Sequence, residues 1–142
     1  MRLAREAIYA GIVRAGEAPG TREIAAATGV SIEAAAGAVR ALAEAHVIVL
    51  EPGTERIRFA PPFAAVETGF RVESDARRRF APCAWDAFGI PAALHRDAEI
   101  AARCAQSGEP MNCSVRDGQA YGNGVVHLLV PAARFWDDII YT

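Results

Sequence analysis

The spacing of apolar residues changes near residue 46, and this change constrains the fold more than any other feature of the chain. Before it, apolar side chains recur every three or four positions, the period of helices buried on one side. After it, residues 47–50 are apolar and mostly β-branched, Pro52-Gly53 is a turn signal, and alternation resumes at 57–59. The sequence therefore predicts an α+β protein that begins with three helices closed by a short β-hairpin, the arrangement of a winged helix.

The three predicted helices have recognisable ends. The first stops before the turn-forming residues 16–20, and Thr21 is placed to cap the second, which Gly29 closes. Ser31 is placed to cap the third helix. The apolar stripe of the first helix consists of Leu3, Ala7, Ile8, Ile12 and Val13.

The pair Pro61-Pro62 interrupts the hairpin pattern and marks a change of organisation. A chain of 142 residues suits one compact domain or two very small ones. We therefore expect a winged-helix-like subdomain over residues 1–60 and a second subdomain over residues 61–142.

The charges do not favour DNA binding by the predicted winged helix. Between residues 31 and 45, which would form the recognition helix, Arg40 is the one basic residue, against Glu33 and Glu44. A face that contacts phosphates needs several basic groups, and the whole chain carries a formal net charge of −2. We therefore predict a structural or dimerising winged helix with no nucleic-acid partner, and DNA binding is the alternative.

Composition and the N-terminal residues indicate a cellular compartment. No apolar run approaches the ~20 residues of a membrane span, and charges recur within the first six residues, unlike a secretory signal. We therefore expect a cytoplasmic protein with no membrane partner. Its three cysteines cannot all pair, so we expect thiols with a packing, metal-binding or catalytic role.

Residues 80–91 carry the strongest chemical signal in the sequence. Pro82 suits the first turn of a helix and Pro91 is expected to end that helix near residue 89, which places Cys83 in the first turn. Cys83 and Asp86 are three residues apart and so share a helix face. The helix N-terminus favours a thiolate, and the neighbouring carboxyl group can accept and return a proton. The pair is therefore a candidate nucleophile and general acid/base.

The spacing alone leaves a second interpretation of this pair open. Cys83 is then a small buried hydrophobic residue, and Asp86 is a surface residue of the first helical turn. A bare pattern of cysteine, two residues and aspartate is a weak motif.

Several segments together resemble the organomercurial lyase (alkylmercury lyase) family. They are residues 83–86 (CAWD), 90–94 (IPAAL), 103–110 (RCAQSGEP) and 125–131 (VVHLLVP). The resemblance implies a mixed α/β lyase-like core with antiparallel strands over residues 61–142. It also implies a β-hairpin that begins near residue 98, where the alanine-rich sequence 98–104 by itself favours a helix, and a strand over residues 125–131.

The resemblance implies protonolysis of a carbon–mercury bond. Cys83 would be the thiol that captures mercury and Asp86 the proton donor, and Cys104 matches a cysteine with a structural role, so we expect it in the core. A soft ion prefers thiolates to oxygen ligands, and the departing carbon needs a nearby acid. No cofactor is implied, because mercury is the substrate and product ion. The implied partners are a small organometallic or thiol-reactive substrate and free thiols that remove the product.

The sequence departs from the family at the second catalytic thiol. The family supplies this thiol after the strand that residues 125–131 resemble, whereas residues 132–142 contain no cysteine. Three explanations stay open: the chain is truncated, Cys113 takes over the role, or the scaffold serves another purpose. The candidate mercury ligands are therefore Cys83, Asp86 and Cys113, although a strand cysteine is more often a packing residue.

Two further groups of residues have both a structural and a functional interpretation. The arginine run 77–79 is interpreted as a solvated surface. The alternative is that its guanidinium groups act on a nearby thiol or anion. Four aromatic residues are expected in the core, and the alternative is a pocket for an organic substituent. They are Trp85, Phe88, Phe135 and Trp136.

Three functions follow from these observations. The first is a lyase that acts on organomercury or a related substrate through Cys83 and Asp86. The second is a non-catalytic or repurposed relative that binds a soft metal or a thiol-reactive ligand. The third is a winged-helix transcription factor whose cysteines sense metal or redox state.

Overall fold

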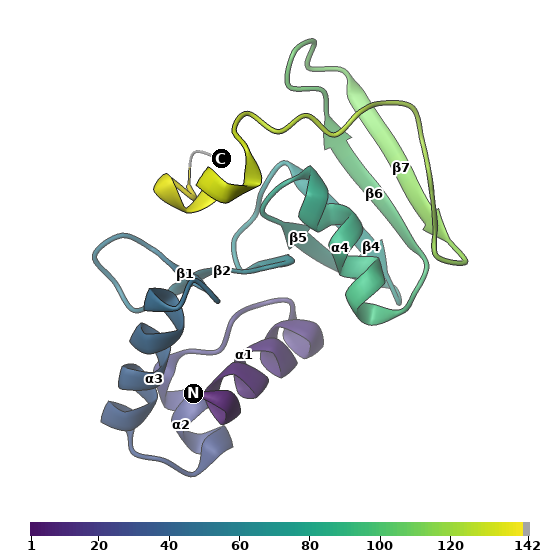
Figure 1. The fold of residues 1–142 in the computed structure, drawn as a ribbon. Helices are drawn as coiled ribbons and strands as arrows, with labels where there is room; N and C mark the ends of the chain where they lie inside the picture. Colours follow the sequence, from purple (N-terminus) through teal and green to yellow (C-terminus); the bar gives the residue numbers. More distant parts are fainter. Residues whose placement is uncertain (141–142) are drawn as a thin grey trace. The chain divides into compact units, whose positions relative to one another are not determined.

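The computed structural model describes residues 1–140 and has the predicted α+β composition of helices and antiparallel strands (Figure 1). The contacts divide the chain into two compact units, one of residues 1–67 and one that begins at Thr68. Each unit has its own buried apolar residues, and we describe them in turn.

The first unit begins with three helices: α1 (Arg2–Ala15), α2 (Thr21–Thr28) and α3 (Ile32–Glu44). Gly16 ends α1 in the left-handed conformation with φ 80°. The Oγ of Ser31 caps α3 by accepting the N–H of Ala34 at 3.2 Å, as predicted. Thr21 is not a cap, because Gly20 holds that position and donates its N–H to the Glu23 carboxylate at 2.8 Å. The helices bury Ile8, Ile12, Ile24, Val39 and Leu42.

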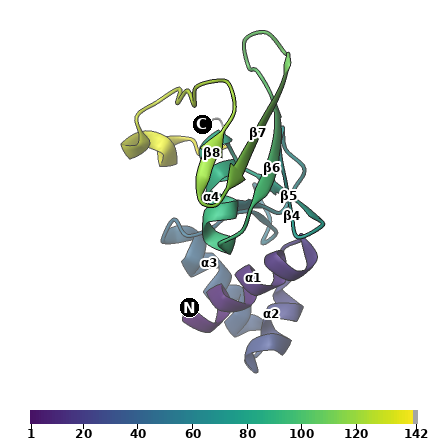
Figure 2. The same cartoon turned by 90° about the vertical axis from the view of Figure 1, so that its right-hand side faces the viewer.

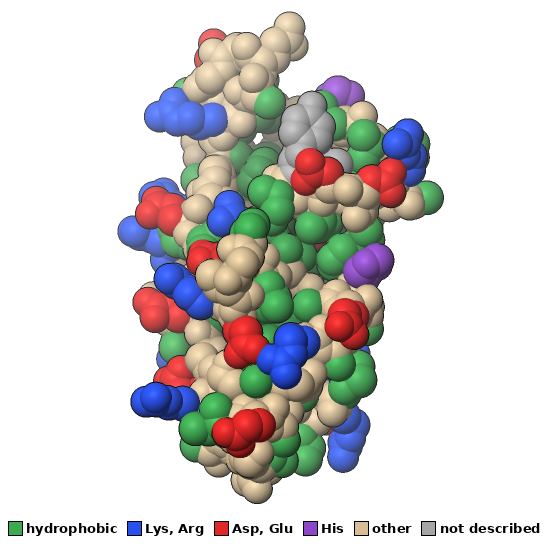
Figure 3. All heavy atoms as spheres, turned by 90° about the vertical axis from the view of Figure 1, so that its left-hand side faces the viewer, with side chains coloured by type: hydrophobic (Ala, Val, Ile, Leu, Met, Phe, Trp, Pro, Cys, Tyr) green, Lys and Arg blue, Asp and Glu red, His purple; other side chains and the backbone are tan. Residues whose placement is uncertain are grey.

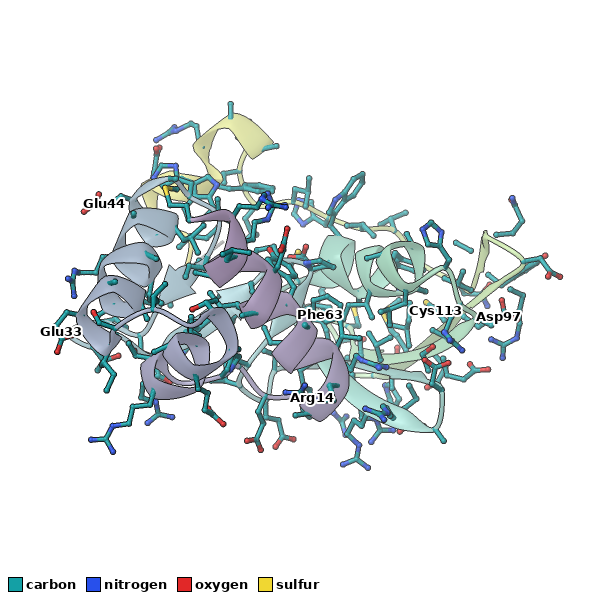
Figure 4. All side chains as sticks on the ribbon, turned by 90° about the horizontal axis from the view of Figure 1, so that it is seen from below. Arg14, Glu33, Glu44, Phe63, Asp97 and Cys113 are labelled. Atoms are coloured by element: carbon teal, nitrogen blue, oxygen red, sulfur yellow. The ribbon has the colours of Figure 1, made fainter. Side chains whose placement is uncertain are left out.

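The predicted hairpin follows the helices. Strand β1 (Val49–Leu50) pairs antiparallel with β2 (Ile57–Ala60), which in turn pairs with β3 (Phe63–Ala64). On α3, Glu33 and Glu44 are exposed and point outward, as Figure 4 shows.

The second unit is an antiparallel sheet with a helix on it, and Figure 2 shows its strands from the side. Its elements are β4 (Phe70–Ser74), β5 (Arg77–Ala81), α4 (Ala84–Leu94), β6 (Ala98–Arg103), β7 (Pro110–Arg116), β8 (Gln119–Tyr121) and the 3-10 helix η1 (Ala132–Asp137). The strand order is β5-β4-β6-β7-β8.

Residues 98–103 form a strand despite their alanine content, and the hairpin implied by the family resemblance is confirmed. Strand β6 pairs with β4 on one side and with β7 on the other. A strand with two hydrogen-bonded neighbours gains more from these ladders than from the modest helix propensity of alanine. The buried side chains Val72, Ile100 and Val115 come from β4, β6 and β7.

Helix α4 packs on β4, β5 and β6 and buries Ala87, Ile90 and Pro91. The expectation that Pro91 ends this helix is wrong, because the helix continues to Leu94 and closes at His95 with φ 52°. Pro91 lacks one backbone donor, but its ring is fully buried, and this burial offsets the missing hydrogen bond.

The strand expected over residues 125–131 does not form. These residues are irregular in the structure, with Val125 90% and Leu129 61% exposed. The sheet of this unit ends at β8, and the chain leaves it through Gly122 and Gly124, whose φ angles are 145° and 148°. An apolar sequence favours a strand when a partner strand and a buried face are available. Here the ladder has already ended at Tyr121.

The surface of the described residues carries both signs of charge. On the face shown in Figure 3, arginine and acidic side chains are interspersed. The predicted cluster 77–79 is split, because Arg77 and Arg78 are exposed whereas Arg79 is 4% exposed and donates to the Ser74 carbonyl at 3.1 Å. Strand alternation places Arg78 on the opposite side of the sheet from Arg79, whereas Arg77 shares the side of Arg79 and is exposed because it begins the strand. None of the helices in the part that the structure describes is long and apolar enough to cross a membrane.

Candidate functional site

Cys83 and Asp86 lie together at the start of α4. Strand β5 ends at Ala81, and Cys83 is the N-cap of the helix, with extended backbone angles of φ −148° and ψ 179°. Its Sγ donates a hydrogen bond to Oδ2 of Asp86 at 3.3 Å. The predicted proximity of the two side chains is therefore confirmed. Cys83 was predicted to lie in the first helical turn. It is instead the cap residue just outside that turn, and Pro82 precedes it.

The strand end that leads into this site is held by a residue that the sequence analysis missed. The Thr68 hydroxyl donates to the carbonyl of Ala81 at 2.6 Å, two residues before Cys83. Its Oγ1 also accepts the N–H of Phe70 at 3.2 Å, so the hydroxyl joins the start of β4 to the end of β5. A lone threonine in an irregular segment gives no sequence signal for this role.

Burial raises the pKa of the Cys83 thiol above its ordinary value, and the nearby Asp86 charge acts in the same direction. The backbone N–H groups of Asp86 and Trp85 oppose this shift, as expected at a helix N-terminus, but they do not outweigh it. The helix end thus favours the thiolate, as predicted, but burial, which the prediction did not include, sets the net direction of the Cys83 pKa. Cys83 rests as a thiol, which agrees with its role as the donor to Asp86.

Burial also raises the pKa of Asp86, and the hydrogen bond from Cys83 partly offsets this shift. A carboxyl group with a raised pKa holds a proton more readily than an exposed one. The two groups therefore form a site in which a proton can pass from sulfur to oxygen over one hydrogen bond. This is the arrangement that a thiol nucleophile and a general acid require.

Cys104 does not lie in the core, contrary to expectation. It is half-exposed in the loop between β6 and β7, where its N–H donates to the Glu109 carbonyl at 2.9 Å. Hydrogen bonds from the Ser107 hydroxyl, and from the backbone of Ser107 and Gln106, lower the pKa of its thiol. The motif shared with the family thus builds a hairpin loop, closed by the bond from the Gly108 N–H to the Cys104 carbonyl.

Cys113, labelled in Figure 4, lies on β7 opposite Ile100 and is half-buried. Its thiol packs over the backbone of Gly122, where an added Cβ would lie 2.6 Å from Sγ. Within residues 1–140, no group of three or more His, Cys, Asp or Glu side chains is arranged to hold a metal ion. The structure thus brings Asp86 to Cys83 but does not gather Cys113 with them, and its role as a mercury ligand stays a prediction.

The four aromatic candidates have different environments. Trp85 is 68% exposed, which excludes the core role expected for it. Phe88 is half-buried on α4, and Phe135 and Trp136 are half-buried on η1. Of the four, Trp85 is thus the most exposed.

Comparison with known proteins identifies relatives with a defined chemistry. The family model described as alkylmercury lyase (MerB) matches residues 63–142, which include the whole Cys83–Asp86 site. A solved structure, described as the mercury-bound form of MerB2, is 26% identical with a TM-score of 0.68. The match covers 85% of this chain and 59% of that one, so the chain spans about three fifths of its length. The search of curated proteins returned no match.

Proposed function

The chain belongs to the alkylmercury lyase family, and from this premise we propose that it cleaves carbon–mercury bonds by protonolysis at Cys83 and Asp86. The observation that carries the proposal is the 3.3 Å hydrogen bond from the Cys83 thiol to the Asp86 carboxylate. It lies inside the segment that matches the family model. Mercury is the substrate and product ion, and the proposed reaction uses no cofactor.

Capture of the substrate is the first step. The Cys83 sulfur attacks the mercury of an organomercury–thiol complex, and a sulfur–mercury bond forms as the thiolate that held mercury leaves. The proton of Cys83 passes to Asp86, to which it is already hydrogen-bonded. Because the pKa of the Cys83 thiol is raised, the carboxylate is needed as the base at neutral pH. The product of this step is a protonated Asp86 beside a Cys83-bound organomercury group.

Cleavage is the second step. Asp86 gives its proton to the carbon bound to mercury, the carbon–mercury electron pair forms the new carbon–hydrogen bond, and the hydrocarbon leaves. The raised pKa of Asp86 favours the protonated state that this step requires. Mercury(II) stays on Cys83 and needs a second thiolate, because soft ions prefer sulfur to oxygen ligands. Cys113 and free thiols in solution are the proposed donors, and free thiols remove the product.

The first unit supports a separate, structural proposal. Its three helices and the β1–β2 hairpin support a winged-helix-like subdomain over residues 1–60, and the family match begins at residue 63, close to this boundary. On α3, Arg40 is paired with Glu55, so its charge is compensated. We therefore propose that this subdomain does not bind nucleic acid, and that the protein acts in the cytoplasm, where thiols stay reduced.

The direct test of the proposed activity is incubation of the protein with phenylmercury and excess thiol. The proposal predicts release of benzene, detected by gas chromatography, at a rate proportional to protein concentration. Cys83→Ser is the matched control, because it keeps the size of the side chain and removes the sulfur. Benzene release at the same rate from this variant would contradict the proposal. Capture without benzene release would instead favour a non-catalytic protein that binds a soft metal.

A further inference from the structure

The hydroxyl group of Thr68 bridges two strands at the point where the chain leaves the sheet toward Cys83. It accepts the N–H of Phe70 on β4 at 3.2 Å and donates to the carbonyl of Ala81 on β5 at 2.6 Å. Phe70 and Ala81 form the last pair of the β4–β5 ladder at this end of the strands. The hydroxyl therefore ties the end of β5 to the start of β4.

One residue separates this strand end from Cys83. Ala81 is fully buried, and the residue that follows it is Pro82, whose ring fixes its φ angle. On its other side Cys83 is held by α4, because its carbonyl accepts the N–H of Ala87 at 3.0 Å. The backbone of Cys83 thus has an anchor on each side, and the Thr68 bridge belongs to the anchor that precedes it.

The distance of 3.3 Å between the Cys83 Sγ and the Asp86 Oδ2 depends on both anchors. Asp86 lies within α4, whereas Cys83 lies just outside the helix with extended backbone angles. The helix therefore fixes the carboxyl group, but the position of the sulfur also depends on where β5 ends. A hydrogen bond weakens steeply when it is misaligned, and a displacement of about 1 Å in a site can lower a reaction rate by about 10²-fold.

We propose that Thr68 is a positioning residue of the reaction, and that its hydroxyl holds the end of β5 so that the Cys83 sulfur stays aligned with the Asp86 carboxylate. The inference rests on the proposed function, in which the Cys83 proton passes to Asp86 during capture of the substrate. Thr68 acts on the sulfur through the backbone, by way of the Ala81 carbonyl.

The first test measures the rate at which Cys83 forms an adduct with the thiol complex of phenylmercury, by mass spectrometry of quenched samples. Thr68→Val keeps the branched shape and removes the hydroxyl, and it should slow capture about tenfold. Thr68→Ser keeps the hydroxyl and should restore most of the rate. Thr28→Val is the matched control, because the Thr28 hydroxyl donates to the Ile24 carbonyl at 2.7 Å in the first unit, and it should leave the rate unchanged. Capture by Thr68→Val at the wild-type rate would overturn the proposal.

A double-mutant cycle distinguishes positioning from a general structural role. If Thr68 acts through the Cys83–Asp86 hydrogen bond, Thr68→Val should lower the capture rate by less than about twofold once Asp86→Asn has removed the carboxylate. An equal loss in both backgrounds would show that Thr68 supports the fold and not the pair. Thr68→Ala allows the same comparison if Thr68→Val does not fold, because it places no methyl group against the Ala81 carbonyl.

Alkylation of Cys83 by iodoacetamide gives a readout that does not involve mercury. Burial and the nearby Asp86 charge both raise the pKa of the Cys83 thiol, so Asp86→Asn should move the pH profile of alkylation toward lower pH. This shift should be smaller in the Thr68→Val background, where the sulfur and the carboxylate are no longer aligned. An equal shift in both backgrounds would overturn the role of Thr68 and leave the lyase proposal intact. Absence of a phenylmercury adduct on a Cys83 that iodoacetamide alkylates would instead overturn the proposed function, and the role of Thr68 in that reaction with it.

Discussion

The Sγ of Cys83 donates a hydrogen bond to Oδ2 of Asp86 across 3.3 Å at the N-terminus of α4. Cys83 is the cap residue just outside the helix, and the carboxyl group of Asp86 belongs to the first turn. Both groups are partly buried, and burial raises the pKa of each. The Cys83 proton therefore lies in the hydrogen bond between the sulfur and the carboxylate oxygen.

Removing the sulfur should abolish capture of the substrate. In Cys83→Ala, no thiol remains within hydrogen-bond distance of Asp86, so the proton acceptor has no nucleophile to activate. Titration with phenylmercury, followed by mass spectrometry of tryptic peptides, should show that residues 83–86 no longer carry an adduct. Cys104→Ala is the control, because that thiol lies in a separate loop, and it should keep the adduct on Cys83. An unchanged affinity for phenylmercury in Cys83→Ala would contradict the assignment.

The raised pKa of Asp86 predicts how stability depends on pH. A carboxyl group whose pKa is raised by folding favours the folded state when it is protonated. This contribution is fully present below the ordinary pKa of 3.8 and is lost as pH rises through the folded-state value. Asp86→Asn removes the cost of a buried charge, so its Tm should exceed that of the wild type at pH 7. Thermal unfolding at several pH values should show the difference shrinking toward pH 3, and a difference that grows toward acid would contradict this account.

Gly122 should be intolerant of a side chain. A Cβ there would lie 2.6 Å from the Cys113 sulfur, and the φ of 145° is also strained for other residues. Gly122→Ala should lower the free energy of unfolding by about 1–3 kcal/mol, the cost of overpacking. Gly69→Ala is the matched control, since its Cβ would meet no neighbour and its φ is not positive, and it should change stability by less than about 0.5 kcal/mol. Equal stability of the two variants in urea unfolding would show that Cys113 moves freely.

The first unit should not bind duplex DNA. On α3, Arg40 is paired with Glu55, and Glu33 and Glu44 are exposed on the outward face. A protein that neutralises phosphates needs several free cations and shows a steep dependence on salt. Fluorescence anisotropy with a random duplex at 0.15 M salt should detect no complex at micromolar protein. A salt-sensitive complex would overturn this prediction.

Local spacing was enough to predict the central pair of the site. Cys83 and Asp86 are close because the side chain of a cap residue lies beside the third residue of its helix, although Cys83 itself has extended backbone angles. The end of α4 depended on tertiary packing instead, because burial of the Pro91 ring lets the helix pass a residue that breaks isolated helices. The sign of the Cys83 pKa shift was likewise set by burial, which a sequence pattern does not contain.

Some strands could be predicted from their local sequence, whereas others depend on partner strands that are distant in the chain. The hairpin of β1 and β2 follows from its turn residues and alternation, and it was predicted. Strand β6 required the family resemblance, because its alanine-rich sequence favours a helix until β4 and β7 pair with it. Residues 125–131 have the composition of a strand, but the ladder ends at Tyr121, and composition alone does not supply a partner.

The most direct test of the proposed mechanism is the mass of the adduct that Asp86→Asn forms with phenylmercury. An amide is nearly isosteric with the carboxyl group but does not cycle a proton, so capture and cleavage should separate. With excess thiol, wild-type protein should release benzene and carry bare mercury or none. Asp86→Asn should accumulate protein plus phenylmercury, with the carbon–mercury bond intact. Benzene release and bare mercury at the wild-type rate in Asp86→Asn would contradict the role of Asp86 as the proton donor.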